Sequence, residues 1–225
     1  KTPRLSRKVR FAIFGVITII GVSIALYNAE ISFPYKHTKT WNFDSYQNGT
    51  DPQGFAEMST DKPGAWIVNS VSDAPSKPNV FEKVLQNDTS PTHLQVFPDS
   101  PTIDGGNMTL KFKIVPGEKG SSAGMLLRFI DAKHYFVLMA DPVANRISLC
   151  KNTPDFLICS YEKQVTITAG QWHTMKAVVS SQGVAAFLDD QLVLRANDHN
   201  YASGQVGLWV KQDTGAYFDD FQLEY

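Results

Sequence analysis

The hydrophobic and polar residues of this chain follow two patterns, one before residue 28 and one after it. From Phe11 to Tyr27 nearly every residue is apolar and none is charged. Beyond that run, short alternating or β-branched stretches recur about every ten residues, separated by Gly, Pro, Asn and Asp. The first pattern is typical of a membrane-spanning helix, and the second is typical of β-strands joined by turns.

The apolar run is long enough to cross a bilayer. As a helix, residues 9–29 would extend about 31 Å, which matches one hydrocarbon core. Five basic residues and no acidic residue precede the run: Lys1, Arg4, Arg7, Lys8 and Arg10. The positive-inside rule therefore places the N-terminus in the cytoplasm and the rest of the chain in the periplasm or outside the cell.

A cleaved signal peptide is the alternative interpretation of this segment. Its hydrophobic stretch is longer than usual, however, and Tyr27-Asn28-Ala29-Glu30 is a poor cleavage site. We therefore expect a retained anchor. Gly21 and Ala25 lie four residues apart, so they form a small face on which another membrane helix could pack.

The chain consequently divides into four predicted parts. A basic cytoplasmic tail (1–10) precedes the transmembrane helix (11–29), a juxtamembrane connector (30–40) and a β-rich domain (41–225). The domain has a formal charge of −6 once the five basic residues of the tail are removed from the total of −1. Nucleic acid is excluded as a partner, since the domain has no basic face or block.

No segment after Tyr27 has helical periodicity. Many short antiparallel strands in one domain predict an all-β fold, a two-sheet jelly-roll sandwich preceded by one transmembrane α-helix. The expected strands are 39–43, 66–69, 81–86, 92–97, 108–115, 123–130, 135–140, 146–150, 156–162, 172–180, 183–188, 191–195, 204–210 and 216–224.

The two cysteines, Cys150 and Cys159, flank turn-forming residues between two apolar strand-like pieces. A hairpin at this position would bring their sulfur atoms together. In an oxidising compartment a disulfide is the natural result, and reduced thiols are the alternative.

Several ordered motifs after Met108 resemble the concanavalin A-like (laminin-G/glucanase) jelly-roll superfamily, and most closely its 3-keto-disaccharide hydrolase-like branch. The resemblance extends over 41–225 and is looser before Met108. The motifs that carry it are Trp41–Asp44, Gly54-Phe55, Ser122–Phe129, His134–Leu138, Gly170–Lys176, Val184–Leu194, Gly204–Trp209 and Tyr217–Leu223. These residues predict a fold and do not by themselves predict a reaction.

Glycoside hydrolysis needs two carboxylates flanking a groove, and a strand would present them as Glu-x-Asp-x-Glu. No such pattern occurs. The acidic pairs Asp189-Asp190 and Asp219-Asp220 fit a turn and the last strand of the resembled fold. The sequence also has no cofactor-binding motif, so we expect a protein that is not an enzyme and binds no organic cofactor.

Two binding sites are candidates. Relatives of the resembled fold often hold a structural calcium ion between the first and last strands, and Asp44 with Asp219 or Asp220 are the matching oxygen ligands; turn capping is the alternative role. A sugar site could form where Arg128, Tyr135, Trp209 and Lys211 share a sheet, although Tyr135 and Trp209 also suit a hydrophobic core.

Three functions follow from these observations. The main prediction is a non-catalytic accessory subunit of a membrane protein complex, photosynthetic or respiratory, because the catalytic pair is absent and the connector is short. The alternatives are a membrane-tethered carbohydrate- or cell-wall-binding module and a glycoside hydrolase-like enzyme. Other membrane subunits are the expected partners under the first prediction, and carbohydrate under the second.

Overall fold

The computed structural model describes residues 35–58, 62–86, 89–97, 99–198 and 200–225. Across these residues the chain folds into β-strands, and no helix there is long and apolar enough to cross a bilayer. The predicted anchor at 11–29, with Gly21 and Ala25, lies outside the described residues. The described domain is one compact unit that begins at Lys36.

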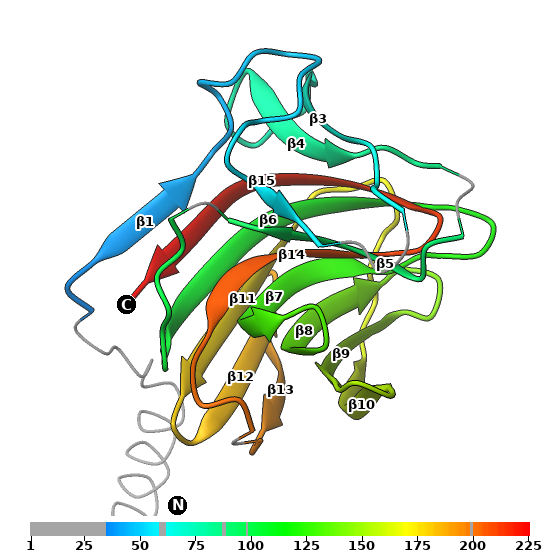
Figure 1. Ribbon diagram of the computed structural model, residues 1–225. Coiled ribbons are helices and arrows are strands. Elements are labelled where there is room, and N and C mark those ends of the chain that lie inside the picture. Colours follow the sequence, from blue (N-terminus) through cyan, green and yellow to red (C-terminus); the bar gives the residue numbers. More distant parts are fainter. Residues whose placement is uncertain (1–34, 59–61, 87–88, 98, 199) are drawn as a thin grey trace, which may run out of the picture. The chain divides into compact units, whose positions relative to one another are not determined.

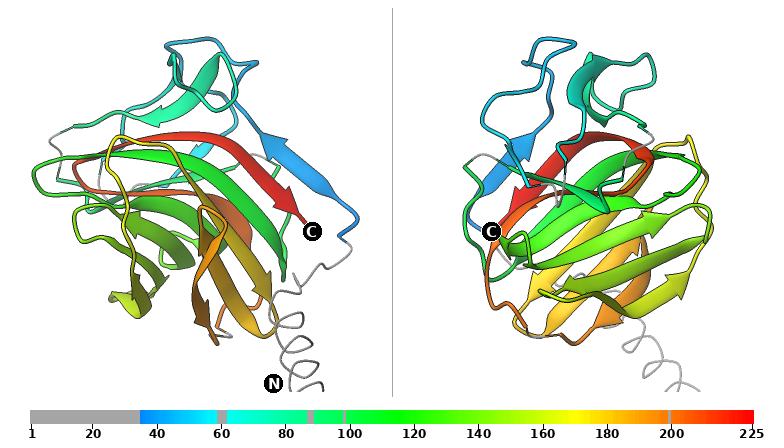
Figure 2. Two further views of the ribbon diagram at one scale, coloured as in Figure 1. Left: turned by 180° about the vertical axis from the view of Figure 1, so that it is seen from behind. Right: turned by 45° about the vertical axis from the view of Figure 1, so that its right-hand side comes forward.

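Two antiparallel sheets stack face to face (Figures 1 and 2), which confirms the predicted sandwich. Sheet A has the order β13-β12-β11-β6-β15-β4-β3, and β1 adds to β15. Its strands are β1 (Thr38–Trp41), β3 (Trp66–Ser70), β4 (Asn79–Lys83), β6 (Gly106–Pro116), β11 (His173–Ser180), β12 (Gly183–Leu188), β13 (Gln191–Ala196) and β15 (Thr214–Glu224).

Sheet B has the order β10-β9-β8-β7-β14-β5-β2. Its strands are β2 (Ala56–Glu57), β5 (Thr92–Val96), β7 (Ala123–Asp131), β8 (His134–Asp141), β9 (Arg146–Asn152), β10 (Leu157–Gln164) and β14 (Gln205–Lys211). Every predicted strand has a counterpart in the two sheets. The two-residue strand β2 was not predicted, because alternation cannot be recognised over so short a piece.

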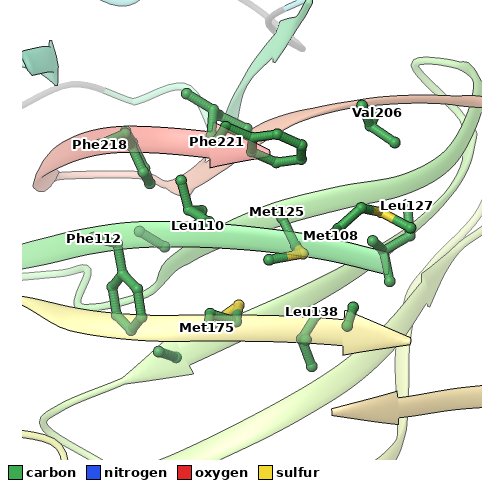
Figure 3. Close-up of a cluster of buried hydrophobic side chains, with 14 of the residues drawn as sticks. Met108, Leu110, Phe112, Met125, Leu127, Leu138, Met175, Val206, Phe218 and Phe221 are labelled. Carbon is green, nitrogen blue, oxygen red and sulfur yellow. The ribbon is translucent and has the colours of Figure 1, made fainter. Parts of the chain in front are cut away.

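The main core fills the space between the sheets. On β6, the alternate residues Met108, Leu110, Phe112 and Ile114 are buried and point inward, as the period of two along a strand requires. Figure 3 shows part of this cluster, where side chains from β6 and β15 meet Met125 and other residues of sheet B. Apolar burial of this kind supplies the main free energy of folding.

A second cluster lies on the other face of sheet B. It includes Leu126, Tyr135, Val137 and Trp209, and all of them are buried. The central strands of sheet B are therefore buried on both faces, and β8 is buried from Tyr135 to its end. This explains why the sequence of β8 is continuously apolar rather than alternating.

Cys150 and Cys159 are directly opposite each other in β9 and β10, and their sulfur atoms are bonded. The predicted disulfide is thereby confirmed. It closes the hairpin whose turn residues the sequence identified. Cys150 itself is fully buried in the second cluster.

Candidate functional site

The four residues predicted to bind sugar have very different environments. Trp209 and Tyr135 have exposed fractions of 1% and 2%, so neither ring presents a face on which a sugar could stack. Burial also raises the pKa of the Tyr135 hydroxyl. Lys211 is exposed at the end of β14. The structure thus does not assemble an open platform from these residues.

Arg128, the fourth residue, joins the two sheets. Its Nη2 donates to the carbonyl oxygens of Asp104 (3.2 Å) and Ser180 (2.9 Å). Burial of the guanidinium lowers its pKa. These contacts give Arg128 a structural role at one end of the sandwich.

The three aspartates predicted to bind calcium hold backbone and side-chain partners in the structure. Oδ1 of Asp44 accepts from the backbone N–H of Asn79 (3.0 Å), and Asp220 pairs with Lys111 (3.0 Å). Asp219 accepts from Ser76. Among the described residues no group of three or more His, Cys, Asp or Glu side chains is arranged to hold a metal ion. Calcium binding stays a prediction.

A line of polar and aromatic side chains crosses the outer face of sheet A. Tyr217 of β15 is paired with Glu82 of β4 on one side and with Lys113 of β6 on the other. Trp172 precedes β11 at the position next to Lys113, since His173 is paired with Phe112. Directly paired residues of neighbouring strands point to the same face. We call Glu82, Tyr217, Lys113 and Trp172 the sheet A row.

The inward neighbours of the row explain why these side chains face outward. Phe81, Phe112 and Phe218 alternate with row residues on β4, β6 and β15, and all three rings are buried in the main core. Because successive side chains on a strand point to opposite faces, burying these rings directs the row to the outer face. Packing in the core therefore positions the row.

Lys113 lies at the centre of the row. Its Nζ is 4.7 Å from the centroid of the Tyr217 ring and 5.0 Å from that of Trp172, which are cation–π distances. The same Nζ donates to both carboxylate oxygens of Asp73, at 2.8 and 3.0 Å. The ammonium group is thus held by three side chains, which limits the entropy that ligand contact would cost.

Asp73 reaches the row from the loop between β3 and β4. Its side chain remains 56% exposed. The hydrogen bond from Lys113 holds the pKa of this carboxyl below its usual range, although partial burial opposes the shift. At neutral pH Asp73 is therefore an ionised hydrogen-bond acceptor, open to solvent beside Trp172.

Glu82 forms the other end of the row. Asn69 of β3 donates from Nδ2 to Oε2 of Glu82 (2.6 Å). Burial raises the pKa of Tyr217, and the nearby charge of Glu82 and a hydrogen bond to it raise it further. Tyr217 thus stays protonated and keeps a hydroxyl donor at neutral pH.

The sequence did not identify this site. Trp172 and Tyr217 belong to two of the motifs that carry the family resemblance, and those motifs predict a fold rather than a binding site. Alternation around Phe112 and Phe218 was a usable signal for which neighbours face outward. The missing information was the pairing of β4 and β6 with β15, which depends on segments far apart in the chain.

Solved structures of similar fold include several proteins named for carbohydrate. A carbohydrate-binding module, CBM66 from Bacillus subtilis, matches with a TM-score of 0.62 at 17% identity, over 76% of this chain and 96% of that one. The carbohydrate recognition domain of Emp47p matches with a TM-score of 0.55 at 8% identity, over 81% of this chain and 92% of that one.

A variant of LamA from Z. galactanivorans, solved with laminaritriose and laminaritetraose, has a TM-score of 0.56 at 12% identity, over 85% of this chain and all of that one (100%). These likenesses show a jelly-roll, galectin-like β-sandwich fold. No protein-family model matches the chain, and a search of curated proteins found no match.

Proposed function

We propose that the domain is a non-catalytic carbohydrate-binding module whose ligand contacts the outer face of sheet A. The observation that carries this proposal is the sheet A row together with Asp73. Two aromatic rings there flank an ordered ammonium group, and two carboxylates lie nearby. Sugars are bound by such combinations of aromatic surface and fixed hydrogen-bonding groups.

The groups of the row are complementary to sugar hydroxyls. Asp73, which is 56% exposed, is an open hydrogen-bond acceptor. Lys113 is a donor and Glu82 an acceptor, although each is only 9% exposed, and the Tyr217 hydroxyl, which is hydrogen-bonded to Glu82, can accept through its oxygen. Each is oriented by a neighbour before a ligand arrives, as the contacts of Lys113 and Glu82 illustrate. Preorganisation of this kind reduces the cost of binding.

The comparisons favour this function over the accessory subunit that was the main prediction from the sequence. CBM66, Emp47p and LamA are named for carbohydrate recognition or solved with oligosaccharides, and they have the same fold. Under this proposal the predicted anchor would tether the module to a membrane. The partners would then be glycans on the far side of that membrane from the basic tail.

The direct test is retention on a glycan array of the full chain, purified in detergent. Asp73→Asn keeps the shape of the side chain and removes its charge, and Trp172→Ala removes one ring of the row. We expect at least one glycan to be retained by the wild type and each variant to weaken its affinity about tenfold, which corresponds to about 1.4 kcal/mol.

Asp131→Asn is the matched control, because Asp131 is another exposed aspartate with a lowered pKa and pairs with His134 away from the row. It should bind like the wild type. The proposal fails if no glycan is retained, or if Asp73→Asn and Trp172→Ala both bind as the wild type does. Release of shorter sugars from a retained glycan would instead favour the hydrolase alternative.

A further inference from the structure

The chain enters the described domain at the same end of the sandwich where it finishes. The backbone N–H of His37 donates to the carbonyl oxygen of Tyr225 (3.1 Å), and the N–H of Tyr225 donates back to His37 (2.9 Å). The start of β1 and the end of β15 accordingly lie side by side in Figure 1. We call this end of the sandwich the terminal end.

Sheet B reaches the terminal end with two of its hairpins. Glu224 is paired with Asn107 at the start of β6, which follows the loop containing Ile103. Ile103 forms a β-bridge with Gly204, and the next residue of β14 is paired with Phe129 near the end of β7. The β7–β8 turn therefore lies at the terminal end, and so does the β9–β10 turn that follows β9.

These two hairpins carry large apolar side chains that the fold does not bury. Phe156, in the β9–β10 turn, is 70% exposed, and Ile130 of β7 is 54% exposed. Leu157 and Ile158 follow Phe156 and are also exposed. The four residues make up half of the exposed large hydrophobic residues in the part of the chain that the structure describes. We call them the terminal-end patch.

The patch is held on a rigid support. The disulfide between Cys150 and Cys159 closes the β9–β10 hairpin at the residue that follows Ile158. Nδ2 of Asn152 donates to the carbonyl oxygen of Ala132 (3.2 Å) and joins this hairpin to the β7–β8 turn. These contacts hold the two hairpins, and the exposed apolar side chains that they carry, in place.

Charge near the patch is balanced. Lys133 and Lys151 lie in or beside the two hairpins, and so do Asp131 and Asp155. Asp131 also pairs with His134. A partner recognised mainly through electrostatic attraction would need an excess of one sign. The patch therefore suits an apolar partner.

We propose that the terminal-end patch inserts into the interfacial layer of a lipid bilayer. The bilayer is inferred as the partner of the patch from the sequence that precedes the domain. The charge-free run ends at Tyr27, and eight residues separate it from Lys36. Even fully extended, they reach about 30 Å at most. If the run spans a bilayer, as its sequence predicts, the terminal end of the domain stays close to that bilayer.

Phenylalanine, leucine and isoleucine near the tips of two hairpins are the side chains expected for shallow insertion into the interfacial layer of a bilayer. The balanced charge means that zwitterionic lipid suffices. In this arrangement the outer face of sheet A is not part of the contact, since Lys113, Tyr217 and Trp172 lie toward the ends of their strands that are opposite the terminal end. The insertion proposal therefore stands or falls independently of glycan binding.

The test uses the full chain reconstituted into phosphatidylcholine vesicles. Phe156→Cys carries a nitroxide spin label at the patch. Val143→Cys is the matched control, because Val143 is equally exposed (69%) but lies in the β8–β9 turn at the opposite end of the same strands. The measurement compares two collision rates of the spin label: one with oxygen, which partitions into lipid, and one with a nickel chelate, which stays in water.

We expect the label at residue 156 to gain oxygen contact and lose nickel contact several-fold on reconstitution, with no change at residue 143. Ile130→Cys, in the other hairpin, should give the same result and does not adjoin the native disulfide. Equal nickel contact at both ends would overturn the proposal. Protection from oxygen and nickel alike would overturn it as well, because it would indicate a protein neighbour such as a second copy.

Discussion

Both carboxylate oxygens of Asp219 accept hydrogen bonds from Ser76, although the two residues are 143 positions apart in the chain. Oδ2 accepts from the backbone N–H at 2.9 Å, and Oδ1 accepts from the hydroxyl at 3.1 Å. Asp219 is fully buried on β15. The contact fixes the β3–β4 loop over sheet A, and the same loop supplies Asp73 to the sheet A row.

The first prediction concerns the pH dependence of stability. Burial, and secondly the charge of Asp220, raise the pKa of Asp219 to about 6. Since the folded state favours the protonated form, this stabilisation is complete below pH 4 and is lost as the pH rises through 6. Its upper limit is about 3 kcal/mol, from a difference of two pKa units.

Urea unfolding of the wild type and of Asp219→Asn between pH 4 and 8 checks this. The wild-type free energy of unfolding, relative to that of the variant, should fall as the pH rises from 4 to 7. Asp73, Asp131 and Asp141 have lowered pKa values, so they make the free energy of unfolding rise with pH. This contribution is present in both proteins and cancels when the free energy of the variant is subtracted from that of the wild type. A constant difference across this range would contradict the assignment.

The second prediction concerns the disulfide. Cys150 and Cys159 close a short loop, and the loss of that constraint on the unfolded chain should lower the free energy of unfolding by about 2–3 kcal/mol. Thermal or urea unfolding with and without dithiothreitol measures the change. A Cys150→Ala/Cys159→Ala double variant should be destabilised in both conditions and should not respond to the reductant.

The third prediction concerns the spacing of strands in sheet B. A Cβ added at Gly207 would lie 2.1 Å from the carbonyl oxygen of Gln95 on β5, so Gly207→Ala must displace one strand backbone. We expect a loss of about 3 kcal/mol or more, as for other severe core overpacking. Gly170→Ala is the control: its φ is +73° but nothing lies within 4 Å, so about 1 kcal/mol is expected.

The fourth prediction separates a binding role of the sheet A row from a structural one. Lys113→Met keeps much of the side-chain volume and removes the charge beside Asp73. Because Asp73 is largely exposed, the ion pair should contribute at most about 1 kcal/mol to stability. Glycan affinity on the array should nevertheless fall about tenfold. A variant that binds normally would assign Lys113 to structure alone.

Local patterns in the sequence were enough to predict the strands and the hairpin that carries the disulfide. Alternation on β6 and the turn residues between Cys150 and Cys159 are properties of neighbouring residues, and both predictions are confirmed. The signal was weakest before Met108, where β2 is only two residues long. There the strand depends on pairing with β5 rather than on its own sequence.

The candidate site depended on information that local patterns do not contain. The tryptophan side chain has a large apolar ring and one polar N–H. From the sequence alone, Trp209 could therefore form a platform for sugar stacking or belong to the hydrophobic core. Only the second cluster on sheet B decides that it is buried. Likewise, Glu82 and Lys113 meet through Tyr217 because β4 and β6 both pair with β15. Such long-range pairing is set by the topology of the whole sheet.

The alternation of core and row residues has a practical consequence for altering this protein. Phe81, Phe112 and Phe218 pack in the core on the inner face of sheet A, while their neighbours Glu82, Lys113 and Tyr217 lie on the other face, where Glu82 and Lys113 are themselves only 9% exposed. Because Lys113 contacts Asp73, Tyr217 and Trp172, these outer positions must be varied together while the inner rings stay constant. The outer face of sheet A is therefore suited to combinatorial libraries, in which new specificities are selected on an unchanged scaffold.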